Sequence, residues 1–515
     1  MLNRSYDYDL VILGGGSAGI VAAAEAGAAG LRTLLIEKGR MGGESMNAGA
    51  AATRTLLHAA QVAHQMRTAD HLGLRPVSLT RADAADVLRH VRSTMAREEE
   101  SEGPTDLLRK HGVEIRIGDP RFISPDALEL SEREGPTRLI SAEHFLLATG
   151  SAPARPAVGA LEEISYITNH DVYELQEVPE SLTVIGAGSV AVEMAQAFAR
   201  LGSRVTLLAK GPRLLPHDDF EAANLLADAL RNEGVDIRLN AEVVGARAEE
   251  ESGTRKIVRI GSDGAQAEVS SREILIAAGR TPNVEGLGLE AARVEFTAGG
   301  VKVNPKLHTS GPRIWACGDV IGRYQFTWMA EFESKLVVHN ILFPFQPKTD
   351  PGFKLAPWVT FTDPEVARVG LTEEEAQKQT IQYQVYRQEF GEGEGQSGVV
   401  KVLATGWQGK ILGAHIVGPR AGDLIHEWIT AISRGQTMRQ VADTIHVYPT
   451  LSRANQDAAT QWYEAQSENP LVRRSVETYV RTVRPNLGRI ALGLVGLGLL
   501  AGGALALRTL RNREE

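Results

Sequence analysis

The chain has 515 residues, of which 43% are apolar and 23% charged, as expected for a globular protein of several domains with a large core. Its formal net charge of −9 provides no general basic field, so we expect no nucleic acid partner. The single cysteine, Cys317, excludes an intrachain disulfide and a cysteine-based zinc cluster, and we predict no metal site.

Residues 8–43 predict a dinucleotide-binding unit, because they contain a strand, a glycine-rich turn, an Ala-rich helix and a second strand. Glycines in such a turn let the backbone approach a pyrophosphate, which the N-terminus of the helix then faces. An acid at the end of the second strand accepts hydrogen bonds from a ribose. The predicted binding residues are Gly14, Gly16, Ser17, Gly19 and Glu37.

Residues 182–213 repeat this pattern, so we expect a second dinucleotide. Its turn supplies Gly186, Gly188 and Ala191. The expected ribose acid is missing, and Lys210 and Arg213 stand there instead. Cations in this place suit a 2′-phosphate and favour NADPH over NADH, although both could be ordinary surface cations.

Near the C-terminus, residues 490–507 are apolar or glycine throughout, and a helix of this length would span about 27 Å of a ~30 Å hydrocarbon core. The segment predicts a single-pass membrane anchor, with a buried or dimerisation helix as the alternative. More arginines precede the span than follow it, which places the preceding domains in the cytoplasm. The arginines before it are Arg473, Arg474, Arg481, Arg484 and Arg489, and those after it are Arg508, Arg511 and Arg513.

Both units, together with residues 147–150, 278–283, 315–319 and 357–366, resemble the pyridine nucleotide-disulfide oxidoreductases. Within this family, these motifs look most like those of mercuric reductase-like and dihydrolipoamide dehydrogenase-like members. The resemblance implies an α/β fold with two Rossmann-like domains for FAD and NAD(P)H, and a homodimer. It also implies that Asp319 holds the flavin ribityl chain and that Glu193 lies where flavin meets nicotinamide. Further cofactor contacts are expected at Gly43, Arg54, Thr149, Gly150 and Gly279.

The domain division follows from these units and from the change to mixed short strands and helices near residue 350. We expect an FAD-binding domain in two parts (1–156 and 281–350) and an NAD(P)-binding domain between them (157–280). An α+β dimerisation domain (351–465), a linker (466–488) and a transmembrane helix (489–508) are expected to follow.

The resemblance breaks at the active centre, where the family carries Gly-Gly-x-Cys-x4-Cys. Here Ser45 and Ala50 occupy the two cysteine positions. A hydroxyl and a methyl group cannot store two electrons or exchange with a disulfide. We therefore expect no disulfide reduction by the family mechanism, and mercuric ion reduction is disfavoured because Hg(II) needs thiolate ligands.

Three further positions depart from the family pattern. Arg54 replaces the lysine that pairs with the glutamate at Glu193. Tyr448 and Arg453 replace the His and Glu of the acid/base pair that serves the partner subunit. Tyr448 and His446 share one face of a strand-like stretch, so His446 is either a proton donor or a packing residue.

Two functions remain open at this point. In the first, NAD(P)H reduces FAD and the flavin passes electrons directly to a small acceptor such as a quinone, oxygen or a second nicotinamide. Glu193, His446 and Tyr448 are the candidate catalytic residues. In the second, the chain is a non-catalytic, membrane-tethered FAD- and NAD(P)-binding scaffold or sensor.

Overall fold

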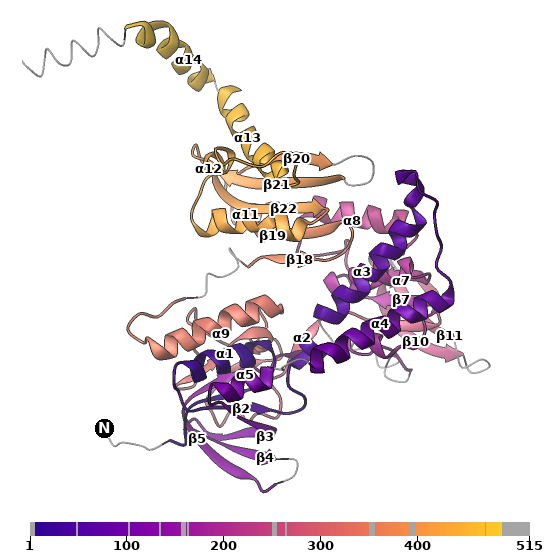
Figure 1. Cartoon of the computed structure of the whole chain (residues 1–515), viewed down its shortest axis with the longest axis vertical. Helices are drawn as coiled ribbons and strands as arrows, with labels where there is room; N and C mark the ends of the chain where they lie inside the picture. Colours follow the sequence, from indigo (N-terminus) through magenta and orange to yellow (C-terminus); the bar gives the residue numbers. More distant parts are fainter. Residues whose placement is uncertain are drawn as a thin grey trace, which may run out of the picture.

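The computed structural model describes residues 6–47, 50–100, 104–132, 135–155, 161, 164–249, 255–262, 265–349, 356–391, 397–468 and 470–486. They form an α/β body of three sheet-based parts, with a helical arm along one side (Figure 1).

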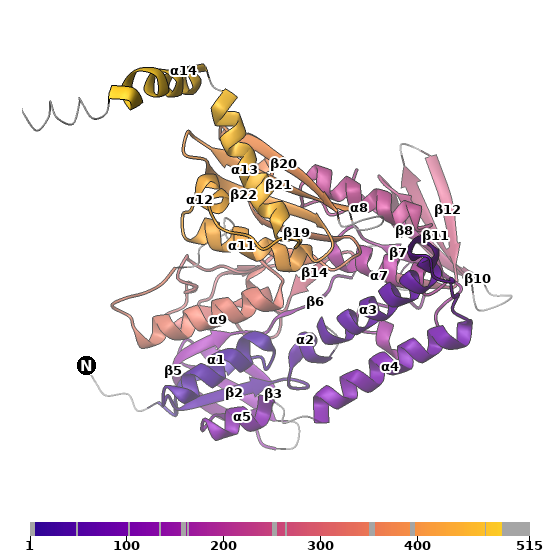
Figure 2. The same cartoon turned by 45° about the horizontal axis from the view of Figure 1, so that its top comes forward.

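The first part is built on a six-stranded sheet whose central strands are parallel, with β1 between β2 and β5. Residues 10–13 of β1 are fully buried, because helices cover the sheet. The second pass of the chain adds β17 and α9, and α9 packs against α1 (Figure 2). The strands are β1 (Tyr8–Leu13), β2 (Thr33–Glu37), β3 (Glu114–Ser124), β4 (Ala127–Glu132), β5 (Arg138–Leu147) and β17 (Ile314–Ala316), and the helices are α1 (Ser17–Ala28), α5 (Pro104–Lys110), η3 (Gly318–Ile321) and α9 (Thr327–Leu342).

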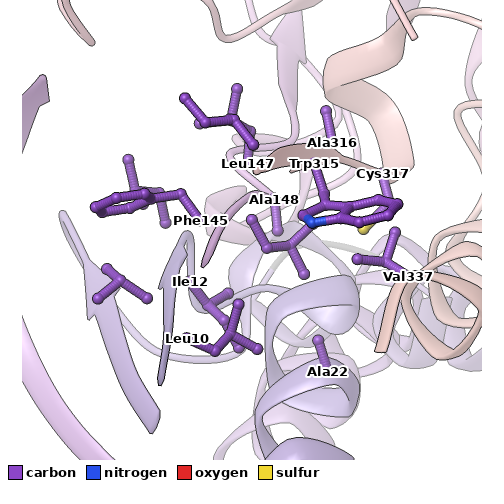
Figure 3. Packing of buried hydrophobic residues seen from close by; sticks show 14 of the residues in the cluster. Leu10, Ile12, Ala22, Phe145, Leu147, Ala148, Trp315, Ala316, Cys317 and Val337 are labelled. Carbon is purple, nitrogen blue, oxygen red and sulfur yellow. The ribbon is translucent and has the colours of Figure 1, made fainter. Parts of the chain in front are cut away.

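Cys317 belongs to the core between this sheet and its helices. Its side chain is fully buried beside Trp315, Ala316 and Val337, as Figure 3 shows. Burial raises the pKa of its thiol well above the usual range. The only sulfhydryl of the chain is therefore a packing group in this structure.

A helical arm leaves the first part and lies against the second. It consists of α2 (Gly43–Asn47), α3 (Ala50–Arg67), η1 (Ala69–Leu72) and α4 (Arg81–Glu100). One face of α3, with Leu56, Ala60 and Ala63, is buried in the same core as Val192 of α7. The short helix α2 thus joins the two dinucleotide-binding parts, and residues next to it can contact both.

The second part has a parallel sheet in the order β13-β7-β8-β9 and a three-stranded antiparallel sheet beside it. Strands β6 and β14 pair where the chain enters and leaves this part. Its elements are β6 (Ser151–Pro153), η2 (Val172–Glu174), β7 (Ser181–Ile185), α7 (Ser189–Arg200), β8 (Arg204–Leu208), α8 (Phe220–Asn232), β9 (Asp236–Arg238), β10 (Glu242–Glu249), β11 (Arg255–Ser262), β12 (Ala265–Ser271), β13 (Glu273–Ile276) and β14 (Arg280–Pro282).

The third part is a five-stranded antiparallel sheet in the order β18-β19-β22-β21-β20 with helices on one face. Buried ion pairs tie it to the second part, since Lys401 of β21 contacts Asp219 at 2.9 Å. Its elements are β18 (Trp358–Thr360), β19 (Glu365–Gly370), α10 (Glu373–Lys378), β20 (Gln384–Gly391), β21 (Ser397–Thr405), β22 (Lys410–Gly418), α11 (Ala421–Ser433), α12 (Met438–Ala442), α13 (Arg453–Glu468) and α14 (Pro470–Thr478). Helix α14 extends away from the body (Figures 1 and 2).

The predicted membrane anchor and membrane localisation require correction. Within the described ranges between residues 6 and 486, no helix is both long and apolar enough to cross a bilayer. The long helices α3 and α4 carry charged or polar side chains in every turn, which a hydrocarbon core would not accept. The predicted span at 489–508 itself lies outside the described residues. We therefore withdraw the transmembrane helix, the membrane partner and the cytoplasm-facing anchor.

Candidate functional site

One large cavity of about 1860 Å³ lies between the first two parts and reaches the third. It brings together most of the residues that the sequence predicts for cofactor binding. Those that line it are Gly14, Gly16, Ser17, Glu37, Gly43, Arg54, Thr149, Gly150, Gly186, Gly188, Glu193, Lys210, Gly279 and Asp319.

The first glycine turn has the geometry that a bound pyrophosphate requires. A Cβ on Gly14 would lie 2.3 Å from the Ala148 carbonyl oxygen, and one on Gly19 would lie 1.8 Å from the Gly14 oxygen, so these two glycines allow close packing. Gly16, by contrast, faces open space apart from Gly43. Gly19 lies behind the turn, whereas Gly16 leaves the N-terminus of α1 accessible to an anion.

Glu37 stands at the end of β2, as predicted. Its Oε2 accepts a hydrogen bond from the Gly15 amide at 2.6 Å, and its Oε1 accepts one from Gly39 at 2.7 Å. The carboxylate therefore lies beside the turn and in the cavity wall, where a ribose hydroxyl could reach it.

The second turn repeats this arrangement. A Cβ on Gly186 would lie 2.1 Å from the Ala277 carbonyl oxygen, whereas one on Gly188 would meet nothing within 4 Å. Ala191 is fully buried, and its Cβ would lie 3.3 Å from a Cβ on Gly186. Gly188 thus keeps the N-terminal end of α7 open for a second pyrophosphate.

The two cations predicted at the second nucleotide have different surroundings. Lys210 lines the cavity and is largely exposed, with Glu242 at 2.7 Å. Arg213 is directed away from this site and forms a bidentate ion pair with Glu374 of α10. Of these two cations, only Lys210 lines the cavity.

Glu193, on α7, is held at the junction of the cavity with β18. Its Oε1 accepts a hydrogen bond from the Phe361 amide at 2.8 Å, and the Arg54 guanidinium lies 4.8 Å from the centre of the Phe361 ring. Burial raises the pKa of Glu193 to about 7, and the Phe361 amide and the Arg54 charge oppose that rise. Its protonation state therefore changes near neutral pH.

The altered active-centre segment lies beside these groups. Ser45 is in α2, and Ala50 begins α3. The side chains at both positions lie outside what the structure describes. Thr53, one turn further along α3, shares a 2.6 Å hydrogen bond with Tyr173, and burial raises the pKa of that tyrosine to about 12.

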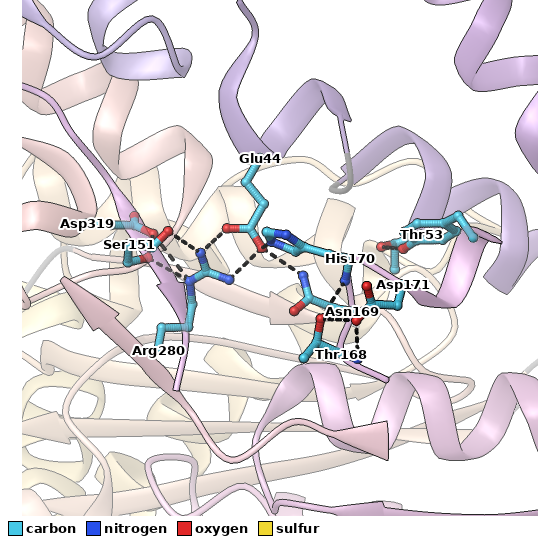
Figure 4. A network of polar contacts seen from close by, with 10 residues as sticks. Glu44, Thr53, Ser151, Thr168, Asn169, His170, Asp171, Arg280 and Asp319 are labelled. Carbon is cyan, nitrogen blue, oxygen red and sulfur yellow. Dashed lines mark hydrogen bonds and ion pairs between the residues drawn. The ribbon is translucent and has the colours of Figure 1, made fainter. Parts of the chain in front are cut away.

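Glu44, immediately before Ser45, is the centre of a polar network that the sequence did not predict (Figure 4). Its carboxylate forms a bidentate ion pair with Arg280. Asn169 Nδ2 donates to Glu44 Oε1 at 2.7 Å, and His170 Nε2 lies 2.7 Å from the same oxygen. Partial burial lowers the pKa of His170, which favours a neutral ring at pH 7.

The network continues to Asp319, the residue expected at the flavin ribityl chain. Arg280 Nε donates to Ser151 Oγ at 2.7 Å, and Ser151 Oγ donates to Asp319 Oδ2 at 2.5 Å. Glu44, Ser151, Asn169, His170 and Arg280 all line the cavity. Arg280 could have been found from its place in the family-like motif 278–283, but no local pattern marks the other four.

Thr149 and Gly150 connect the two passes of the chain through the first part. Thr149 Oγ1 donates to the Asn283 carbonyl at 2.8 Å, and the Asn283 side chain donates back to the Thr149 carbonyl at 2.8 Å. The nearby Gly279 has a positive φ of 115° and open space at its Cβ position. These contacts fix the cavity wall between β5 and β14.

Tyr448 and His446 lie in the third part, between α12 and α13. Tyr448 is 81% exposed. His446 Nε2 lies 2.8 Å from Glu427 Oε1, and its Nδ1 lies 2.9 Å from the Thr444 carbonyl oxygen. Arg453 pairs with Asp457 on its own helix. Neither Tyr448 nor His446 is brought into the cavity of its own chain.

Residues 8–334 match the family described as "Pyridine nucleotide-disulphide oxidoreductase", and residues 356–459 match its dimerisation domain. The chain belongs to this family. The second match supports a homodimer.

Relatives of similar sequence include mercuric reductases and dihydrolipoyl dehydrogenases. The chain is 34% identical to a mercuric reductase of Streptomyces lividans, over 89% of this chain and 97% of that one. It is also 34% identical to a dihydrolipoyl dehydrogenase of Thermus scotoductus, over 88% and 96% of the two chains. The solved structure of the HOCl-induced flavoprotein disulfide reductase RclA from Escherichia coli, as a Cu(II) complex, superposes with a TM-score of 0.74 at 26% identity, covering 89% and 100%.

The cofactors of this family are FAD and NAD(P)H, and the cavity suits both. It has two open glycine positions at helix N-termini, Gly16 and Gly188. Two acids also line it, Glu37 beside the first glycine turn and Asp319 beside Ser151.

Proposed function

We propose that this chain is an FAD-dependent NAD(P)H oxidoreductase that passes electrons from the flavin directly to a small acceptor, without a redox-active disulfide. The observation that carries the proposal is the cysteine content: the whole sequence has only Cys317, and it is buried in the first core. Two sulfurs would be needed for dithiol storage of two electrons.

The donor side rests on residues that line the cavity. When bound, FAD supplies hydride acceptance from the nicotinamide and electron release to a second substrate. The turns at Gly16 and Gly188 would hold the two pyrophosphates, and Asp319 would hold the ribityl chain. Lys210 would favour the 2′-phosphate of NADPH over NADH, because it is the cation at the end of β8 that faces the cavity.

On the donor side, we propose that Glu193 accepts and releases a proton. It is buried where α7 meets β18, and its pKa of about 7 lets it exist in both protonation states at physiological pH. Arg54 would limit that rise while the Phe361 ring fixes its guanidinium in position.

His446 and Tyr448 would act only toward a second copy of the chain. Both lie on the third part, which matches the dimerisation domain, and Tyr448 is largely exposed. A tyrosine side chain there could contact the acceptor of the partner subunit, whereas the Glu427 contact favours a structural role for His446.

The test is an anaerobic titration of the purified, FAD-loaded chain with NADPH and, separately, with NADH. We expect one equivalent of the donor to bleach the visible flavin absorbance. The absorbance should return when an acceptor is added, without any added thiol. If the bound flavin stays oxidised with both NADPH and NADH, the proposed function is contradicted and a non-catalytic FAD- and NAD(P)-binding role is supported.

A further inference from the structure

Four aromatic side chains line the cavity and are here called the aromatic wall: Phe326, Trp328, Trp358 and Phe361. The first two stand at the N-terminal end of α9, and the other two belong to β18 and the residue after it. The Phe326 and Trp328 rings are nearly parallel, at 7° with centres 4.9 Å apart, and Phe326 lies 5.9 Å from Trp358 at 25°. Trp328, Phe326 and Trp358 therefore form one stack of near-parallel rings.

The polar edges of the two indoles are already satisfied. Trp328 Nε1 donates to the Pro357 carbonyl at 2.9 Å, and Trp358 Nε1 donates to Asp218 Oδ1 at 2.9 Å. Trp358 is buried, with the Arg368 guanidinium 4.1 Å from its ring centre. Trp358 is thus held in place, whereas Trp328 lines the cavity and remains 37% exposed.

The aromatic wall is joined directly to the residues expected at the flavin. The Phe361 amide holds Glu193, and Arg54 lies over the Phe361 ring. At the other end, helix α9 packs on the turn that carries Asp319, because a Cβ on Gly318 would lie only 3.1 Å from the Ala330 Cβ. A planar molecule on this wall would share the cavity with the flavin.

We infer that the aromatic wall seats a planar aromatic two-electron acceptor, of the quinone class, with Trp328 as the residue that determines this preference. The inference rests on the proposed function and names its acceptor. Stacking on aromatic faces favours a flat ring over an octahedral metal complex. NAD(P)H supplies a hydride and solvent supplies a proton, so that the quinone leaves as its hydroquinone and the nicotinamide leaves oxidised.

The experiment compares Trp328→Leu, Trp328→Phe and a matched control, Trp407→Leu, in the FAD-loaded chain. Trp407 is 79% exposed on the turn between β21 and β22, outside the cavity lining. Each variant is assayed with NADPH or NADH and either menadione or ferricyanide, and the menadione-to-ferricyanide ratio of kcat/KM is recorded. Binding of menadione to the oxidised protein, without nicotinamide, is measured by protein fluorescence quenching.

We expect Trp328→Leu to lower the ratio and the menadione affinity by about fivefold or more, Trp328→Phe to restore most of both, and Trp407→Leu to change neither. A ratio that Trp328→Leu leaves unchanged would overturn the inference. If that variant instead shifts the dimer to monomer in size-exclusion chromatography, the wall is a subunit contact and the inference is also wrong. If NAD(P)H bleaches the flavin but the ratio stays the same in Trp328→Leu, the quinone inference is wrong and the proposed function still holds. If NAD(P)H does not bleach the flavin, the proposed function is itself wrong.

Discussion

Replacing Glu44 by Gln should weaken cofactor retention and stability, because this carboxylate carries the polar network of the cavity. The Glu44→Gln amide turns an N–H group toward the Arg280 donors and removes the negative charge that they share. Arg280 keeps the Ser151 hydroxyl at 2.7 Å, the Ser151 carbonyl oxygen at 3.1 Å and Asp319 at 3.5 Å. Removing one partner of a fully buried pair costs ~3–5 kcal/mol, and of an exposed pair ~0–1 kcal/mol.

The Glu44 and Arg280 side chains are 22% and 18% exposed, so the expected loss lies between these limits, at ~2 kcal/mol. The matched control is Glu242→Gln, because the Lys210 and Glu242 side chains are 78% and 57% exposed at a similar distance of 2.7 Å. It should cost less than ~1 kcal/mol. Thermal release of FAD, followed by flavin fluorescence, and urea unfolding measure both variants. Equal shifts for the two would refute the view that the Glu44 network supports the site.

Three further outcomes are expected. Burial favours the neutral form of Glu193 in the folded protein, so its contribution to the free energy of unfolding is complete below the unfolded pKa of about 4.5 and is lost as pH rises through 7. Urea unfolding between pH 4.5 and 8 should therefore show wild type losing ~3 kcal/mol relative to Glu193→Gln. Lys210→Ala should raise the ratio of the KM for NADPH to the KM for NADH about fivefold, whereas Arg213→Ala should leave that ratio unchanged and lower stability, because Arg213 pairs with Glu374. Steady-state kinetics that give the same ratio for both variants would disprove this assignment. Cys317 should resist iodoacetamide in the native state and react only on unfolding, as followed by intact mass; rapid native alkylation would show that the thiol is accessible.

The two glycine turns were predictable because each depends on a short, local pattern. A strand, a glycine turn and a helix within about 30 residues dictate the open positions at Gly16 and Gly188, and Glu37 follows at the end of the next strand. The α/β class followed from the same alternation.

Contacts between distant segments were not predictable in this way. Glu44 meets Asn169, His170 and Arg280, which lie 125 to 236 residues further along the chain. Arg213 looked like a nucleotide ligand because it follows the right strand, but Glu374, 161 residues away, takes its guanidinium. The membrane prediction rested on hydropathy alone and had no tertiary support in the described chain.

The Cys317→Ala variant has no sulfhydryl at all, so it tests directly whether electrons leave the flavin without sulfur. The FAD-loaded variant is mixed anaerobically with NADPH or NADH, and a quinone is added once the flavin has bleached. Our account predicts that bleaching and reoxidation persist at close to the wild-type rates, because the buried thiol takes no part in electron transfer. Loss of reoxidation in a folded, FAD-retaining Cys317→Ala protein would contradict electron release from the flavin without sulfur.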